Sequence, residues 1–101
     1  MTYSISVRGR AERDIEEKVE WYRTRAPEQV LRFLGEIDAV KVLIRDSPGL
    51  YPAPYRSTHR APLSTFPHFL WYRVDHNARH IRVLAVSHHR QDPDRIRRRL
   101  R

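Results

Sequence analysis

Hydrophobic and polar positions in the first third of the chain follow two periods, of which the first indicates a strand and the second a helix. Residues 3–7 alternate large apolar and small polar side chains, which predicts a half-buried strand, and Gly9-Arg10 separates this strand from the next segment. Apolar residues then recur at intervals of four, four, three and four, on one face of a helix: Ala11, Ile15, Val19, Tyr22 and Ala26. We expect this helix to end near Ala26, because Pro27 disfavours helical geometry in the residue before it.

A second helix is predicted directly after the first. Pro27 suits the first turn of a helix, since its missing N–H would have no intrahelical partner there. An apolar stripe with helical spacing follows: Val30, Phe33, Leu34, Ile37, Val40 and Ile44. The segment Ser47-Pro48-Gly49 ends this helix. Two helices with almost no linker between them form an αα-hairpin.

The second half of the chain carries strand patterns. Residues 49–58 are rich in proline and have no clear period, so we expect an ordered loop that leads into a strand over residues 59–63. Pro62 confines that strand to a sheet edge or a bulge, because proline cannot donate a ladder hydrogen bond. The rest predicts a β-hairpin made of an aromatic-rich strand, a turn and a second strand: residues 68–74, 75–79 and 80–88.

The order of these elements indicates the fold class. Asp92 and Pro93 predict the N-cap and first position of a short terminal helix, which residues 95–100 fill. The chain is therefore expected to be α+β: an N-terminal strand, an αα-hairpin, a three-stranded antiparallel segment completing one sheet, and a short C-terminal helix. We expect an antiparallel sheet with the helical hairpin on one face. A length of 101 residues fits a single domain over residues 1–101.

The net charge of the chain and its distribution indicate which classes of partner the protein could bind. The net charge is +8, and residues 47–101 carry 11 basic and 3 acidic side chains, so the surplus lies in the second half. All but two of the 20 basic residues are arginine, which forms bidentate pairs with phosphate and carboxylate groups. Nucleic acid and an acidic protein segment both suit such a surface.

The absence of cysteine excludes disulfides and cysteine-ligated zinc, and it fits a reducing cytoplasm, where we expect the protein to act. The first residues lack the pattern of a signal peptide, and no apolar run reaches the roughly 20 residues of a membrane helix. Six histidines occur without the spacing of a metal site on a helix, so we expect structural or surface roles and neither a metal nor a cofactor.

Three clusters allow a functional and a structural interpretation. His88 or His89 near Arg60, Arg82 or Arg90 would move a proton or stabilise a phosphate transition state, but we favour a basic strand edge with ordinary surface residues. Alternation places one aromatic pair on one face of the third strand, and either base stacking or core packing accounts for it: Phe69 and Trp71. We favour core packing for at least one face of that strand. The arginines of residues 90–101 fit either a solvated helix or a contact with DNA, RNA or an acidic partner.

The order of motifs resembles that of the RelE/ParE superfamily, the toxins of bacterial type II toxin–antitoxin pairs. The resemblance covers nearly the whole chain. It begins with the Tyr-x-Ile strand and the segments 11–15 and 21–22, and continues through Phe33-Leu34, Ser47-Pro48-Gly49 and Arg60. Its most specific parts are Phe-Pro-x-x-x-x-Tyr at residues 66–72 and Val-x-His-x-Arg-x-Asp-Pro at residues 86–93.

The resemblance implies a small toxin held inactive by a cognate antitoxin, in a hetero-oligomeric complex. RelE-like members are ribosome-dependent mRNA endonucleases, whereas ParE-like members inhibit DNA gyrase and are not nucleases. RelE-like nucleases commonly carry an arginine where this chain has Phe69, and this tail has no tyrosine. The ending of the motif over residues 86–93 is similar to the ParE branch and to plasmid-stabilisation proteins.

We therefore expect a ParE-like gyrase inhibitor without catalytic residues, neutralised by a ParD-type antitoxin. The expected gyrase-binding residues share a place near the C-terminus: His88, Arg90, Arg95, Arg97 and Arg98. An mRNA endonuclease is the alternative, and its catalytic residues would be Arg60, Arg82 and His89. A further alternative is a non-toxic relative that only binds its antitoxin.

The expected antitoxin segment is amphipathic, partly acidic and folds on binding. Its apolar anchors would meet whichever members of one hydrophobic group are exposed: Trp21, Tyr22, Phe33 and Leu34. If all four belong to the core of the helical hairpin, this surface does not exist.

Overall fold

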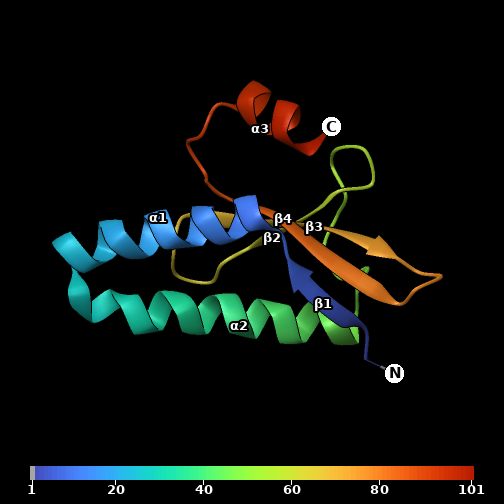
Figure 1. Ribbon diagram of the computed structural model, residues 1–101, viewed down its shortest axis with the longest axis horizontal. Helices are drawn as coiled ribbons and strands as arrows, with labels where there is room; N and C mark the ends of the chain where they lie inside the picture. The colour runs from blue at the N-terminus through green and yellow to red at the C-terminus, as the bar shows by residue number, and fades with distance from the viewer. Residues whose placement is uncertain (1) are drawn as a thin grey trace.

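The computed structural model describes residues 2–101, and its elements follow the predicted order (Figure 1). Met1, which the predicted domain 1–101 includes, lies outside the described residues. The elements are β1 (Ser4–Val7), α1 (Gly9–Arg25), the 3₁₀ turn η1 (Pro27–Gln29), α2 (Val30–Asp46), β2 (His59–Pro62), β3 (His68–Asp75), β4 (His80–His88) and α3 (Pro93–Leu100). The α+β fold class is confirmed. Several boundaries differ by a few residues: Gly9 and Arg10 form the first turn of α1, residues 27–29 form a 3₁₀ turn before α2, and β2 ends at Pro62.

The helix ends follow local chemistry. The Ala26 N–H donates to the Tyr22 carbonyl oxygen at 2.6 Å, and Pro27 begins η1 immediately afterwards. The Asp92 carboxylate accepts a hydrogen bond from the Asp94 N–H at 3.0 Å, with Pro93 at the first helical position, so α3 begins as predicted.

The four strands form one sheet in the order β1-β4-β3-β2. Strands β2, β3 and β4 are antiparallel, and β2, which contains Pro62, is an edge strand as predicted. Strand β1 is parallel to β4, so the expectation of a wholly antiparallel sheet was wrong for this strand. The reason is that a period of two marks a strand but carries no information on its direction; the placement of the hairpin between β1 and β2 sets it.

A β-bulge controls which side chains of β4 face each side of the sheet. Trp71 lies opposite Ala85, whereas the next residue, Tyr72, lies opposite Val83, so Leu84 is the extra residue. Leu84 and Ala85 both pack on the α3 side, and Val83 and Val86 both join the core beneath α1 and α2. Without the extra residue, the side chains after it would exchange faces.

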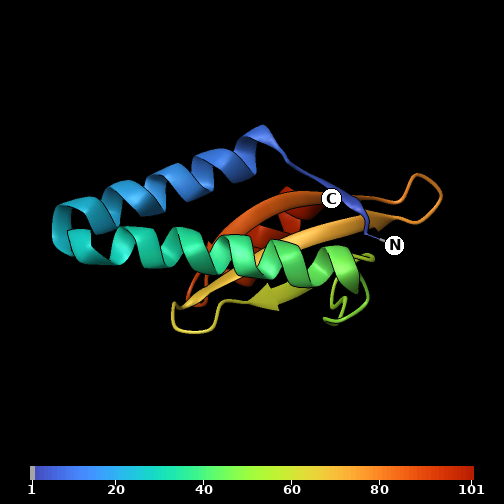
Figure 2. The same ribbon diagram turned by 90° about the horizontal axis from the view of Figure 1, so that it is seen from below.

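Helices cover both faces of the sheet. In Figure 2, α2 lies in front of the strands and α3 lies behind them. Leu70 and Tyr72 are fully buried toward the helical hairpin, while Trp71 is buried against Ile96 and Leu100 of α3. The Trp71 indole N–H donates to the Ser87 hydroxyl at 2.9 Å. Both aromatic faces of β3 therefore contribute to packing, which confirms the core interpretation for Trp71. No helix among residues 2–101 is long and apolar enough to span a membrane.

Candidate functional site

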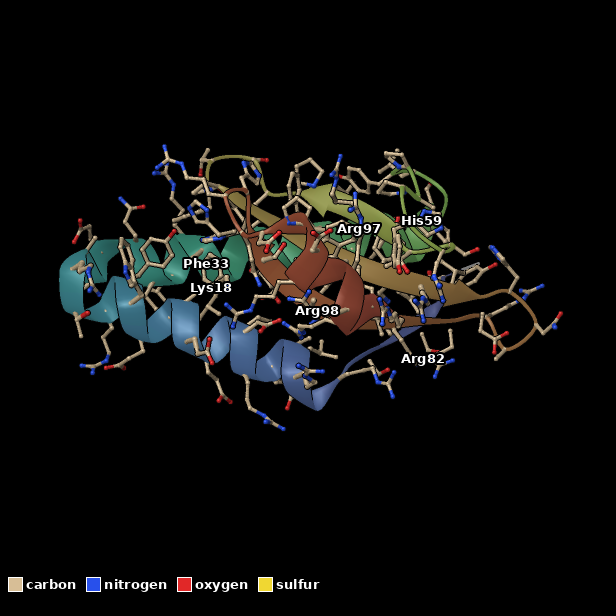
Figure 3. All side chains as sticks on the ribbon, turned by 90° about the horizontal axis from the view of Figure 1, so that it is seen from above. Lys18, Phe33, His59, Arg82, Arg97 and Arg98 are labelled. Carbon is tan, nitrogen blue, oxygen red and sulfur yellow. The ribbon has the colours of Figure 1, made fainter. Side chains whose placement is uncertain are left out.

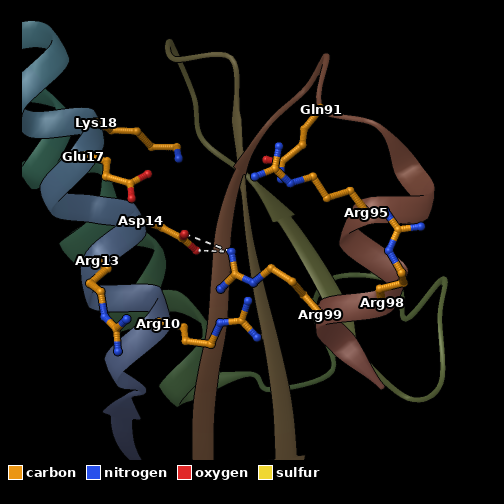
Figure 4. A pocket seen from close by; sticks show the side chains of 9 residues that line it. All are labelled: Arg10, Arg13, Asp14, Glu17, Lys18, Gln91, Arg95, Arg98 and Arg99. Atoms are coloured by element: carbon orange, nitrogen blue, oxygen red, sulfur yellow. Dashed lines mark hydrogen bonds and ion pairs between the residues drawn. The ribbon is translucent and has the colours of Figure 1, made fainter.

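Two neighbouring hollows border α1, and they differ in chemistry. The first, which we call the trough, lies between α1 and α3 and has a volume of about 680 Å³ (Figure 4). Polar and charged side chains line it: Arg10, Arg13, Asp14, Glu17, Lys18, Gln91, Arg95, Arg98 and Arg99. The second, which we call the notch, has a volume of about 560 Å³ and lies farther along α1. Its lining is more apolar: Glu17, Lys18, Trp21, Tyr22, Pro67, His68 and His88.

An ion pair braces the two walls of the trough. Nη1 of Arg99 on α3 lies 2.9 Å from both carboxylate oxygens of Asp14 on α1. The same carboxylate accepts the Val86 N–H at 2.9 Å, beyond the point where β1 stops pairing with β4. Asp14 thus satisfies a backbone donor that would otherwise be unpaired, and it joins α1, β4 and α3. The two paired side chains are only 13% and 14% exposed, so this brace is largely desolvated.

The other cations of the trough have no such partners. Within residues 2–101, no ion pair involves Arg10, Arg13, Arg95 or Arg98. Arg10 reaches toward the middle of the trough from α1, and Arg95 reaches toward it from the opposite wall (Figure 4). Burial lowers the pKa of Lys18 against the opposing influence of Asp14 and Glu17. The trough is therefore a fixed, predominantly positive surface.

The notch contains an exposed tryptophan and a buried histidine. Trp21 is 51% exposed, although it packs edge-on against Tyr22 and lies under the Arg25 guanidinium. His68 is 4% exposed, and its Nε2 is hydrogen-bonded to the Tyr22 hydroxyl at 3.0 Å. Burial, together with the charge of Lys18, lowers the pKa of His68 to about 4, so the ring is neutral near pH 7.

The other ring nitrogen of His68 has no partner. Nδ1 is buried and makes no hydrogen bond within the described residues. The ring of His88, the cross-strand neighbour of His68, packs edge-on against the His68 ring, with 5.3 Å between the ring centroids. A buried polar atom without a partner is costly in a folded protein, so this nitrogen lowers the stability of the fold.

A third, smaller hollow of about 150 Å³ lies beneath α3. The Arg60 guanidinium carbon lies 4.6 Å from the centre of the Phe69 ring, and the centre of the His89 ring lies 4.1 Å from the same point. Arg60 and His89 therefore both contact the ring of Phe69. Within residues 2–101, no group of three or more acidic or histidine side chains is placed to hold a metal ion.

The expected gyrase-binding residues do not form one surface. Arg95 and Arg98 line the trough, whereas Arg97 pairs with Asp94 and lines the hollow beneath α3. His88 lines the notch and also the hollow beneath α3, which it shares with Arg97. Arg90 is exposed after β4, where its N–H donates to Nδ1 of the same histidine at 3.0 Å. The structure thus brings together two of the five residues in the trough.

The hydrophobic group predicted for antitoxin contact is divided. Phe33 is fully buried and Tyr22 is nearly so, because both face the sheet from the helical hairpin. Leu34 is half-buried, and Trp21 is exposed. Phe33 therefore belongs to the core and is not available as a contact, while Trp21 is available.

The residues expected for a nuclease are likewise divided. Arg60 and His89 line the hollow beneath α3, but Arg82 is not among the residues that line it. Arg82 is exposed near the start of β4, opposite Arg73 and close to the hairpin turn (Figure 3).

The sequence interpretation missed most of the α1 side of both hollows. A second stripe with helical spacing runs beside the apolar stripe of α1: Arg10, Arg13, Asp14, Glu17, Lys18 and Trp21. That stripe was a visible signal, but charged residues with this spacing are usual on a solvated helix face. His68 had no signal, because its burial depends on contacts from three distant elements.

Comparisons with known proteins agree with this architecture. Residues 5–93 match the family described as the ParE toxin of the type II toxin–antitoxin system, parDE. Among solved structures, the chromosomal ParDE system from P. aeruginosa gives a TM-score of 0.73 at 16% identity, over 86% of this chain and 96% of that chain. The comparison with curated proteins finds no match.

Two other structures share the fold at lower scores. The RelBE2 toxin–antitoxin complex from Mycobacterium tuberculosis gives a TM-score of 0.59 at 20% identity, over 87% of this chain and 99% of that chain. A mutant of the E. coli toxin RelE in the free state gives 0.57 at 14% identity, over 89% and 86%. These likenesses confirm the RelE/ParE-like fold. Because the family match spans most of the sequence, the chain belongs to the ParE toxin family of type II toxin–antitoxin systems.

Proposed function

We propose that this protein is a toxin that inhibits DNA gyrase and is neutralised by a ParD-type antitoxin. The observation that carries the proposal is the match to ParE toxins over residues 5–93. It is supported by the absence of an arginine at Phe69, where RelE-like nucleases commonly have one. The fold is shared with a ParDE system, whose name pairs such a toxin with its antitoxin.

The notch is the proposed antitoxin site. Trp21 gives it an exposed apolar wall, and Pro67 adds another exposed surface. Interface anchors are commonly apolar or aromatic side chains that fill such hollows. An amphipathic antitoxin segment supplies the apolar side chain that fills this hollow.

The shared wall of the notch and the trough suggests how neutralisation works. Glu17 and Lys18 line both hollows, so a segment anchored beside Trp21 continues directly into the trough. Carboxylates of that segment would meet the unpaired arginines there. The antitoxin would thereby cover Arg95 and Arg98, which belong to the proposed gyrase-binding surface, without entering the core.

Gyrase contact is assigned here to exposed cations and not to catalytic groups. Arg95 and Arg98 form the part of the predicted surface that the trough gathers, with Arg90 exposed on the approach to α3. Arg97 and His88 remain proposed contacts at its borders.

An mRNA endonuclease is the second candidate, favoured by one observation. Arg60 and His89 meet on the Phe69 ring, where a guanidinium would stabilise a phosphate and an imidazole would transfer a proton. However, the hollow of about 150 Å³ is smaller than the roughly 300 Å³ typical of ligand pockets, because Ile96 and Leu100 of α3 cover it. The nuclease therefore requires α3 to move, whereas the gyrase inhibitor does not.

The test uses the purified full chain and a bacterial host. Supercoiling by gyrase should stop at stoichiometric toxin, and induced expression should trigger a DNA damage response while translation continues. Co-expression of the antitoxin should restore growth. Unaffected supercoiling together with cleaved mRNA and arrested translation would favour the nuclease. Unaffected growth and supercoiling, with antitoxin binding retained, would leave a non-toxic binding protein.

A further inference from the structure

Most of the excess positive charge of this chain is gathered in one place. A further hollow of about 420 Å³, distinct from the notch, shares Arg10, Arg13 and Arg99 with the trough. It extends the trough past Arg8 and Leu84. Together the two hollows contain seven basic side chains and two carboxylates, a net charge of +5 out of +8 for the chain. We call the pair the extended trough.

This charge is not neutralised within the protein. Of the two carboxylates, Asp14 is already held by Arg99, and Glu17 alone faces the remaining cations. Like charges held close together destabilise the folded state by repulsion. The Asp14 brace nevertheless fixes the walls that bear them, so the arrangement is suited to an external polyanion.

The side chains that line the extended trough favour one class of polyanion over the others. Every side chain in the extended trough is charged or polar, except for Leu84 and the glycine at the start of α1. A protein segment would need apolar anchors at the centre of its interface, and the extended trough offers little of this kind. Single-stranded nucleic acid would need aromatic side chains for its exposed bases, and none lines this surface. A duplex exposes its phosphates while its bases stay stacked inside.

We infer that the extended trough binds the phosphate backbone of duplex DNA without reading its sequence. Arginine on both walls matches phosphate geometry, since the guanidinium group forms bidentate hydrogen bonds with phosphate oxygens. Arg10 to Lys18 spans about 12 Å of α1, and each strand of B-form DNA carries one charge per roughly 3.4 Å of the axis. One phosphate ridge along the opening therefore brings about three to four phosphates within reach of the unpaired arginines.

This inference rests on the proposed function and gives the trough, including Arg95 and Arg98 of the proposed gyrase-binding surface, a second ligand. A toxin held on DNA by the extended trough would meet gyrase where the enzyme holds its own DNA. The choice of DNA over an RNA duplex rests on gyrase as the proposed target, whereas the preference for a duplex rests on the lining alone. An antitoxin segment that continues from the notch into the trough would displace the DNA.

The test is binding of a short fluorescent DNA duplex to the full chain, measured by anisotropy between about 50 and 200 mM salt. The trough variant R10Q/R95Q removes one inward-pointing arginine from each wall. The control R32Q/K41Q removes the same charge from α2. We expect the trough variant to lower the slope of log affinity against log salt by about 0.9 per arginine, and to weaken binding at low salt at least about tenfold. The control should bind like the unmodified chain.

Three results would overturn the inference. Equal weakening by the control would mean that only net charge matters. Tighter binding of single-stranded RNA, or of polyglutamate, with the same dependence on Arg10 and Arg95 would assign the surface to that ligand. No duplex binding at low salt would remove the inference outright. Gyrase inhibition measured on the same preparations separates the two proposals. Inhibition without DNA binding would contradict only the DNA-binding inference. DNA binding without inhibition would contradict only the proposed function.

Discussion

The notch and the trough share two residues of α1, yet they are built for different ligands. The notch combines an exposed tryptophan with a neutral buried histidine, so desolvation of apolar surface dominates there. The trough presents unpaired arginines around one braced ion pair, so electrostatics dominates. The contrast shows that one helix serves two kinds of recognition by turning two adjacent stripes of side chains toward different neighbours.

The largest expected effects come from substitutions in the core and in the notch, and they act on different quantities. Phe33→Ala should lower the free energy of unfolding by about 4 kcal/mol, because it empties a fully buried site. Trp21→Ala should leave the chain folded but weaken antitoxin binding by about 2 kcal/mol, as expected for an interfacial anchor. Urea unfolding and calorimetric titration measure the two quantities.

The exposed Leu31 provides the control for Trp21. Leu31→Ala should change neither unfolding nor antitoxin binding to a comparable degree. If Trp21→Ala unfolds the chain, or binds antitoxin normally, the notch is not the antitoxin site.

The next effect concerns the brace that shapes the trough. Asp14→Ala should destabilise the fold by about 3 kcal/mol, because Arg99 loses its partner in a largely buried position and the Val86 N–H loses its acceptor. The double variant D14A/R99L should recover part of this loss in urea unfolding, since it removes the uncompensated charge. A double variant no more stable than D14A would show that the ion pair contributes little and that the backbone acceptor accounts for the loss.

A smaller effect is a dependence of stability on pH that originates in the notch. The pKa of His68 is about 4 in the folded chain and ordinarily 6.5, so the unfolded chain binds a proton first as the pH falls. Stability due to this group is fully present above pH 6.5 and is lost progressively down to about pH 4. The lowered pKa of His88, caused mainly by burial, acts in the same direction.

Urea unfolding at several pH values measures this slope, and H68Q is the comparison, because glutamine does not titrate. The unmodified chain should lose stability relative to H68Q as the pH falls. A difference that does not change between about pH 7 and about pH 4.5 would contradict a neutral buried His68. Arg32→Gln, on α2, gives the control for an unrelated exposed change.

The smallest effect is expected in the trough. R10Q/R95Q should raise the midpoint of thermal unfolding of the free chain by about 1 °C, because it relieves repulsion between like charges. The same variant should lose DNA affinity. A fall in the midpoint would mean that these arginines contribute to the fold, and it would weaken the contrast with the notch.

Short-range patterns predicted much of this molecule. The existence of the second helix, the aromatic strand and the Asp92-Pro93 cap followed from the sequence because periodicity and capping are local properties. Trp21 and Phe33 were grouped together, however, although one is exposed and the other is buried. Helical spacing separates the two residues, because Phe33 lies on the apolar stripe of α2 and Trp21 lies beside the stripe of α1.

The sequence by itself determined the order of elements, the family and the excess of arginine. The tertiary structure decided that β1 runs parallel to β4, that α3 closes the second face of the sheet, and that Asp14 meets Arg99 across 85 positions of the chain. It also decided that His68 is buried beside Tyr22 with one nitrogen unpaired. These features depend on contacts between distant segments, whose energies are set by burial and distance in space, and neither quantity is written in the spacing of residues along the chain.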